Sequence, residues 1–170
     1  AWAAGVFQRR ITRALLLGMG GSSLCPEVLA TTSHVLSGPM LALTVLDSTD
    51  PAVIRAAADA HPPAETLVIV STKSGATTET ASLEAFFWER FRERLGDEAG
   101  AHVVAITDPG TVLESRAKAR GYRRVFLNPA DIGGRYSAIS YFGLVPAALM
   151  GYDLPGLLSR AQDMARRCGP

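Results

Sequence analysis

The sequence predicts an α/β fold in which five parallel strands form one sheet between two layers of helices. Short apolar runs alternate with longer segments of helical period between residues 14 and 125. These runs do not alternate in polarity, as expected of strands buried on both faces. A length of 170 residues suits one domain and is too short for two full-sized ones. We therefore expect a three-layer α/β/α sandwich with strand order 2-1-3-4-5, a single domain over residues 1–170, and a helical lead-in over residues 1–13.

The predicted strands are five runs of this kind, and the third is the most continuously apolar. They cover residues 14–19, 41–46, 66–70, 102–106 and 124–126.

Helices are predicted after residue 23 and at residues 51–60, 77–95, 111–120, 137–150 and 154–167. The clearest is 77–95, because Leu83, Phe87, Phe91 and Leu95 fall on one stripe. Pro146 is expected to kink or split the helix over 137–150, since it lacks a backbone donor.

Composition and charge exclude several classes of protein. Hydrophobic residues make up 48% and charged residues 19%, which excludes a disordered chain. Seventeen basic against sixteen acidic side chains leave a formal charge of +1, so no nucleic-acid partner is expected. The longest apolar run, residues 141–152, falls short of the roughly 20 residues that cross a bilayer, so no membrane partner is expected.

The cysteines and the N-terminal residues indicate the setting of the chain. Cys25 and Cys168 lie far apart, with neither a CxxC spacing nor a group of histidines beside them. This argues against a disulfide framework and a structural metal site, so we expect no metal and a reducing, cytoplasmic location. Residues 1–10 contain no initiator methionine and no signal-peptide pattern, so we expect a piece of a longer protein.

The turn after the first strand is rich in glycine and serine, and it reads Gly18-Met-Gly-Gly-Ser-Ser-Leu24. Glycine lets a ligand approach the backbone, and amides at a helix start carry partial positive charge. The turn therefore predicts an anion site in the segment from Gly18 to Leu24. The alternative is a tight turn in which Ser22 only caps the helix. A dinucleotide site is disfavoured, because Ser23 occupies the position of the third glycine in that fingerprint.

The turn after the third strand carries five hydroxyl side chains, a glycine and a lysine between Ser71 and Thr78. Hydrogen bonds to a charged acceptor contribute about 1.5 to 3 kcal/mol each, so three or four donors can hold a phosphate monoester. The alternative is a capping box, Thr77 with Thr80 or Ser74 with Thr77, which would use only two hydroxyls. Strands one and three are neighbours where the strand order reverses, so both turns should face one crevice.

A third glycine-bearing turn, Asp131-Ile-Gly-Gly-Arg-Tyr-Ser137, follows the fifth strand. The paired glycines free the backbone to aim Arg135 inward, where its permanent charge would stabilise negative charge developing on an oxygen. The alternative is a surface turn with Arg135 bound to Asp131.

The remaining polar residues have simpler interpretations. Trp88 lies off the apolar stripe of its helix, and we expect it to pack on a neighbouring element. The histidines share no spacing typical of a metal site, so solvation or local bonding is expected for His34, His61 and His102. Helix capping is expected for Asp47, Asp50 and Asp108.

Taken together, three ordered motifs resemble the sugar isomerase (SIS) domain that forms the first half of phosphoglucose isomerases. They are Gly18-Met-Gly-Gly-Ser-Ser-Leu24, Thr72-Lys-Ser-Gly-Ala-Thr-Thr-Glu79 and Gly133-Gly-Arg-Tyr-Ser137. The phrases between them look most like the isomerase half of bacterial transaldolase and phosphoglucose isomerase fusion proteins: Val45–Pro51, Ala105–Gly110 and Gly143–Ala148. The resemblance covers the chain from Ala14 onward and implies the flavodoxin-like strand order.

The resemblance also implies a function. The family interconverts glucose 6-phosphate and fructose 6-phosphate through an enediolate, without a metal or another cofactor. Arg135 matches the arginine that stabilises the enediolate. Thr72 stands in place of a more usual serine and Ala76 in place of a threonine. The phosphate-binding positions of the family are matched by Gly21, Ser22, Thr72, Lys73 (through its amide), Ser74 and Thr77.

The family's catalytic glutamate, ring-opening histidine and late lysine belong to segments outside this sequence. A positioned base contributes about 10²- to 10⁴-fold in rate. We therefore expect the 170-residue chain to bind sugar phosphate weakly without turning it over, and the longer protein to isomerise. The expected partners are a hexose phosphate, a second SIS domain of the longer chain, and a second copy in a homodimer.

Two alternative functions follow from the same features. A non-catalytic SIS-type regulatory module would sense a sugar phosphate and would have no use for the charge of Arg135. A nucleotide-binding oxidoreductase domain would prefer NAD, and Ser23 argues against it.

Overall fold

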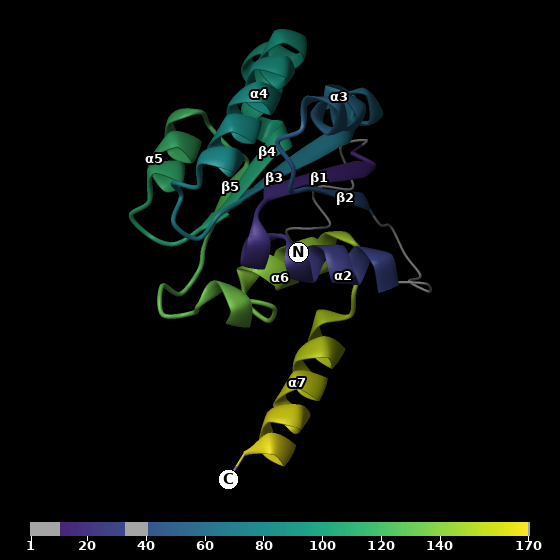
Figure 1. The fold of residues 1–170 in the computed structure, drawn as a ribbon, viewed down its shortest axis with the longest axis vertical. Helices are drawn as coiled ribbons and strands as arrows, with labels where there is room; N and C mark the ends of the chain where they lie inside the picture. The colour runs from purple at the N-terminus through teal and green to yellow at the C-terminus, as the bar shows by residue number, and fades with distance from the viewer. Residues whose placement is uncertain (1–10, 33–40, 170) are drawn as a thin grey trace.

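The computed structural model describes residues 11–32 and 41–169, and its strands form one parallel sheet (Figure 1). The sheet has five strands in the order β2-β1-β3-β4-β5, so the predicted order is confirmed. Every predicted strand end agrees with the structure to within one residue. The strands are β1 (Arg13–Gly18), β2 (Ala42–Leu46), β3 (Thr66–Ser71), β4 (Val103–Thr107) and β5 (Arg124–Leu127).

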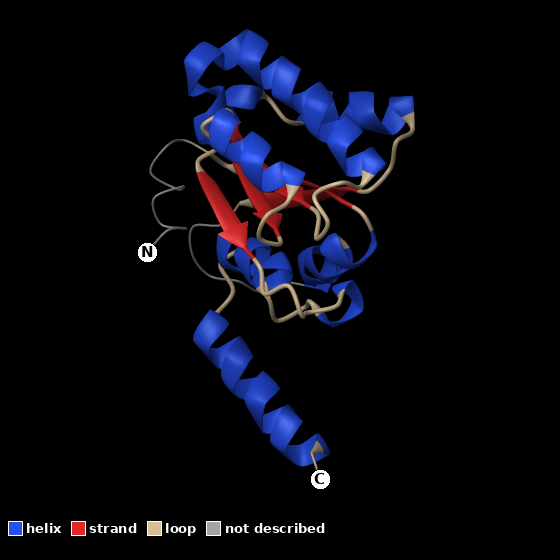
Figure 2. Ribbon diagram, turned by 90° about the vertical axis from the view of Figure 1, so that its left-hand side faces the viewer, coloured by secondary structure: helices blue, strands red, loops and turns tan. Residues whose placement is uncertain are grey.

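Helices cover both faces of the sheet, which confirms the three-layer sandwich (Figure 2). One face packs against α3 (Pro51–Ala60), α4 (Thr78–Leu95) and α5 (Val112–Ala119). The core of the other face includes α6 (Tyr141–Leu149), and α2 (Leu24–Thr32) lies beside α6. Short 3₁₀ turns connect these elements at Gly20–Ser22, Pro63–Glu65, Gly96–His102 and Gly134–Tyr136.

The register of the central strands brings their carboxyl ends to one edge of the sheet. Gly18 at the end of β1 pairs with Ser71 at the end of β3, and Ser71 pairs with Ile106 in β4. All residues of β3 and β4 are buried, because helices cover both of their faces. The turns after β1, β3 and β4 therefore start side by side.

The apolar stripe of α4 is confirmed, but it is not the only part of the helix that is buried. Glu84 is only 2% exposed, and its carboxylate accepts hydrogen bonds from Arg116 and from Arg120, the latter at 2.9 Å. Tyr122 donates to it as well, at 2.5 Å, and burial together with this carboxylate raises the pKa of the tyrosine. These partners compensate a charge that would otherwise be costly to bury, and they join α4 to α5.

Trp88 packs on this cluster, which confirms that it contacts a neighbouring element. Its ring lies 4.8 Å from the guanidinium carbon of Arg120, and its centroid is 5.5 Å from that of Tyr122. The contact with Arg120 is a cation–π interaction.

Three predictions about helix starts and caps need correction, and of the predicted kink or split at Pro146 the split is absent. The helix predicted over 137–150 begins four residues later, at Tyr141, where Ser140 caps it, and Pro146 lies inside the helix without splitting it. Asp108 caps no helix, because Thr111 is the N-cap of α5. Asp50 does cap α3, accepting from two amides at 2.7 and 3.1 Å, so Asp47 does not.

The two ends of the described chain differ, because Ile11 is buried at the start whereas no residue of the last helix is. The predicted lead-in of residues 1–13 lies mostly outside the described residues, and Arg13 already belongs to β1. Helix α7 (Leu154–Cys168) projects away from the sheet and has no fully buried residue (Figure 1). The described helices include none with the length and apolar composition of a membrane span.

Local bonding of histidine is confirmed at His61 and His102, whereas His34 lies outside the described residues. His61 is 4% exposed, and its Nδ1 lies 2.7 Å from the carbonyl oxygen of Ala57. Its Nε2 lies 3.1 Å from the hydroxyl of Thr44. The neutral ring satisfies both partners when Nδ1–H donates and Nε2 accepts. Burial lowers the pKa of His61, and the charge of Arg13 lowers it further against the opposing effect of the carbonyl.

This environment makes stability depend on pH. The unfolded chain takes up a proton at His61 near pH 6.5, whereas the folded protein resists it, so the free energy of unfolding falls as pH drops below about 6.5. Urea unfolding at about pH 7.5 and about pH 5.5 measures this loss. The loss should be smaller in His61→Gln, and an equal loss in both proteins would contradict the assignment.

Candidate functional site

The turns at the carboxyl edge of the sheet enclose a cavity of about 430 Å³. It is lined by Met19, Gly21, Ser22, Thr72, Lys73, Ser74, Thr77, Asp108 and Gly134. The predicted crevice between the first and third turns is therefore present. All six residues predicted from the sequence to bind phosphate line it, and they come from two separate turns.

The turn after β1 places its backbone against the loop that follows β5. A Cβ atom added at Gly21 would lie 2.4 Å from the carbonyl oxygen of Gly134, so only glycine fits there. Ser137 strengthens this contact by donating to the carbonyl oxygens of Gly21 and Gly134, at 3.2 and 2.7 Å. In this turn the hydroxyl that bonds the backbone is that of Ser23, which donates to Gly20. Among the described hydrogen bonds, the Ser22 hydroxyl makes none to α2, so the capping interpretation is wrong.

Hydroxyls in the turn after β3 bond to one another and to the neighbouring turn. Ser71 donates to the carbonyl oxygen of Ser22 at 2.9 Å, which links the two turns. The hydroxyls of Thr72 and Thr77 lie 3.0 Å apart. Ser74 accepts from the amide of Ala76 at 3.2 Å. These contacts hold the loop in place.

Thr77 is the N-cap residue of α4, yet its side chain makes no capping hydrogen bond. The predicted capping boxes are therefore not formed, and the Thr77 hydroxyl faces Thr72 instead. The first amides of α4 remain without a side-chain cap beside the cavity, and such a helix N-terminus favours an anion. Gly75 permits this path, with φ at +68° and no room for a Cβ beside Thr111.

Lys73 and Asp108 form an ion pair at the rim of the cavity, which sequence reasoning missed. The Lys73 ammonium also donates to the carbonyl oxygen of Ala130 at 2.8 Å. No local pattern in the sequence identifies the pair, and the strand register explains it. Ser71 pairs with Ile106, and Lys73 and Asp108 each follow two residues later, so they lie side by side.

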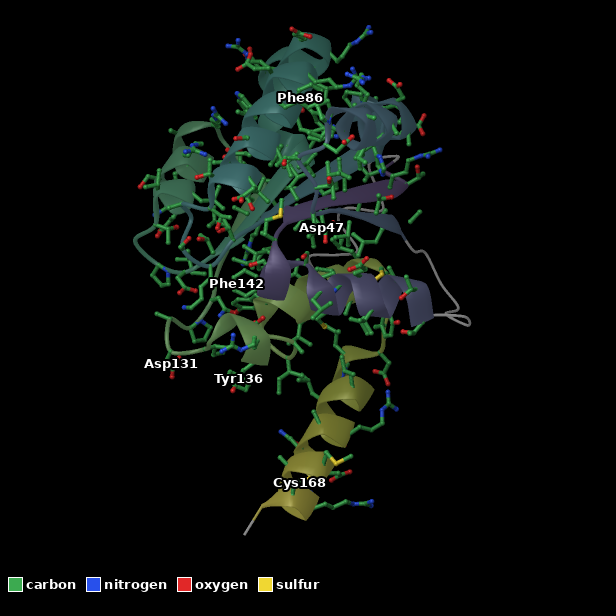
Figure 3. The ribbon with its side chains drawn as sticks, in the orientation of Figure 1. Asp47, Phe86, Asp131, Tyr136, Phe142 and Cys168 are labelled. Atoms are coloured by element: carbon green, nitrogen blue, oxygen red, sulfur yellow. The ribbon has the colours of Figure 1, made fainter. Side chains whose placement is uncertain are left out.

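Arg135 lies next to the cavity rather than in its lining. It is exposed, and it lines a smaller cavity of about 270 Å³ together with Gly21, Gly133, Gly134 and Tyr136. Among the described ion pairs there is none between Arg135 and Asp131, and Figure 3 shows Asp131 and Tyr136 on the outer side of this loop. Gly21 and Gly134 line both cavities. The two cavities therefore adjoin at two glycines, which have no side chains to separate them.

The arrangement has the chemistry of an anion site rather than a metal site. Its lining offers hydroxyls, backbone amides and a helix N-terminus, and its lysine is neutralised by Asp108. Within residues 11–32 and 41–169, no group of three or more His, Cys, Asp or Glu side chains is placed to hold a metal ion.

Solved structures with a similar fold include two with clear sequence similarity. A hypothetical protein from Thermus thermophilus matches with a TM-score of 0.84 and 31% identity, over 99% of this chain and 41% of that one. A glucose-6-phosphate isomerase from Chlamydia trachomatis matches with a TM-score of 0.78 and 27% identity, over 89% of this chain and 29% of that one. The Vibrio vulnificus NanR protein, at 16% identity and a TM-score of 0.52, shares only the fold.

Sequence comparison agrees with the structural matches. The glucose-6-phosphate isomerase of a Synechococcus species is 38% identical over 161 residues, which cover 91% of this chain and 29% of that protein. The glucose-6-phosphate isomerase of Thermus thermophilus is 36% identical over 149 residues, covering 87% and 35%. This chain therefore spans about a third of the length of such relatives. The sequence profile of the phosphoglucose isomerase family matches residues 1–168, and the chain belongs to that family.

Proposed function

We propose that this chain is the sugar-phosphate-binding domain of a glucose-6-phosphate isomerase. The full-length protein interconverts glucose 6-phosphate and fructose 6-phosphate through an enediolate. The observation that carries the proposal is the single cavity in which the turns after β1 and β3 bring their hydroxyls and amides together. Membership of the phosphoglucose isomerase family supports the same substrate class.

In this proposal the phosphate is held by neutral donors. Thr72 and Thr77 share one hydrogen bond, so one of the two hydroxyls keeps its proton free to donate to the anion. Ser22, the amide of Lys73 and the N-terminus of α4 supply further donors, with Ser74 beside them. Each hydrogen bond to a charged acceptor contributes about 1.5 to 3 kcal/mol, which is enough to offset the immobilisation of a small ligand.

The position of Arg135 suits the reacting end of the sugar. With the phosphate in the larger cavity, the carbon chain passes over Gly21 and Gly134 and reaches the smaller cavity lined by Arg135. A guanidinium there stabilises the negative oxygen of an enediolate, and it remains charged at any working pH. Proton transfer between carbons one and two then needs a base from another part of the protein.

The proposal includes a second SIS domain in the longer protein, a homodimer and a cytoplasmic location. An apolar groove of about 650 Å³ lies between α2 and the loop before α6. It supports contact with another protein domain on this side of the chain. It is lined in part by Leu24 and Val28, which are 60% and 49% exposed. The fusion to a transaldolase stays a prediction.

The 170-residue chain alone is expected to bind glucose 6-phosphate without isomerising it, because the base lies outside the chain. A coupled assay for fructose 6-phosphate on the purified chain measures turnover, and calorimetry on the same sample measures binding. Turnover well above that of a heat-denatured sample would contradict this division of roles.

Binding should be selective for the sugar phosphate and should depend on the hydroxyl pair. Titration calorimetry is expected to show glucose 6-phosphate binding more tightly than NAD, and preference for NAD would refute the proposal. Thr72→Val keeps the side-chain shape and removes the hydroxyl, so affinity should fall about tenfold. The matched control Thr78→Val changes an exposed threonine outside this cavity and should leave affinity unchanged.

Arg135→Ala separates an isomerase from a sensor of sugar phosphate. In the full-length protein the substitution is expected to lower kcat at least a hundredfold, as typical for removal of one charge-stabilising donor. Affinity of the same variant for inorganic phosphate should change little, because Arg135 does not line the phosphate cavity. Unimpaired kcat would refute the role given to Arg135, whereas an intact effector response without isomerisation by the unmodified protein would favour the regulatory module.

A further inference from the structure

The ammonium of Lys73 already has two hydrogen-bond partners in the structure, although lysine is the residue that a phosphate would be expected to attract. Its ammonium donates to the carboxylate of Asp108 and, at 2.8 Å, to the carbonyl oxygen of Ala130. Asp108 is the first residue after β4, and Ala130 lies in the loop between β5 and Arg135. One side chain thus joins three loops at the carboxyl edge of the sheet.

The backbone of Lys73 is also hydrogen-bonded to the end of β4 and the loop after it. Its carbonyl oxygen accepts from the amide of Asp108 at 3.2 Å and from the hydroxyl of Thr107 at 3.3 Å. The amide of Thr72 donates to Ile106 at 3.0 Å, so the turn continues the pairing of β3 with β4. By contrast, the loop after β5 is joined to the β3 turn through the Lys73 ammonium.

Asp108 depends on this lysine in turn. Its side chain is 12% exposed, and Oδ2 accepts from Lys73. The other oxygen, Oδ1, is buried and has no hydrogen-bond partner within the described part of the chain. A carboxylate with one unsatisfied oxygen is poorly compensated, so removing Lys73 would leave a buried, unpaired charge.

We propose that Asp108 is a positioning residue of the phosphate site, acting through Lys73. By holding the ammonium against Ala130, it sets the β3 turn at a defined distance from the loop that carries Gly134 and Arg135. It also keeps the lysine charge away from the anion, so the phosphate meets the amide of Lys73 and not its side chain. This inference rests on the proposed function of the cavity.

The opposite arrangement makes an opposite prediction. If the ammonium of Lys73 bound the phosphate directly, Asp108 would be a competing negative charge beside the anion. Its neutralisation would then tighten binding. The sign of the effect of Asp108→Asn therefore distinguishes the two arrangements.

The experiment is a double-mutant cycle on the affinity for glucose 6-phosphate and for inorganic phosphate, measured by calorimetry. Asp108→Asn and Lys73→Met are each expected to weaken binding about tenfold, because either change breaks the ion pair between Lys73 and Asp108. The double variant should be no weaker than the single ones by more than about twofold. Lys73→Arg, which keeps the charge and the donors, should recover most of the affinity.

Asp131→Asn is the matched control, because Asp131 is an exposed carboxylate next to Ala130. It should change affinity less than about twofold. All titrations are made well below the midpoint of thermal unfolding of each variant, so that only folded protein is compared. If Asp108→Asn does not fold, the ion pair is still tested by the loss of affinity in Lys73→Met and its recovery in Lys73→Arg.

Three results would overturn the inference while leaving the proposed function intact. They are equal or tighter binding by Asp108→Asn, full additivity in the double variant, and a lowered unfolding midpoint with unchanged affinity. Failure of the unmodified protein to bind either glucose 6-phosphate or inorganic phosphate would instead refute the proposed function, and the inference with it.

Discussion

The site depends on the parallel register of β1, β3 and β4. Because Gly18 pairs with Ser71 and Ser71 pairs with Ile106, three chain segments leave the sheet at the same level. Backbone and side-chain hydrogen bonds then close these segments into a ring. Ser71 links the first two turns, Lys73 links the next two loops, and Ser137 returns to the first turn. The cavity is the space that this ring encloses, so its shape follows from strand pairing.

In the proposed function, this ring is preorganised for a small anion. Most of its hydroxyls are oriented by partners within the ring, and the N-terminus of α4 opens onto it without a side-chain cap. In that proposal an anion binds without requiring the loops to reorganise, which lowers the entropic cost of binding. Gly21 and Gly134 line both this cavity and the smaller one beside Arg135, so the proposed binding and reaction occupy adjacent spaces.

The layer formed by α3, α4 and α5 contains a polar cluster beside its apolar core. Arg116, Arg120 and Tyr122 surround the buried carboxylate of Glu84 between α4 and α5, and the N-terminus of α4 lies at the cavity. Burying such a group gives little net stability, but removing one partner is strongly destabilising, typically by about 3 to 5 kcal/mol. The cluster therefore favours one orientation of α4, and with it the position of the helix N-terminus beside the cavity.

The sequence by itself determined the class of fold, the strand order, and the meeting of the first and third turns. Continuous apolar runs, the glycines and the hydroxyls are local features, and they report local structure and burial directly. Only the tertiary structure decided that Thr77 faces Thr72, that Asp108 pairs with Lys73, that Glu84 is buried, and that Arg135 stands beside the cavity. The partners of Lys73 and Glu84 lie in other loops or helices, and the partner of Thr77 lies five residues away in the same turn. A polar side chain chooses among caps, ion pairs and solvent according to which neighbour packing brings within hydrogen-bond distance.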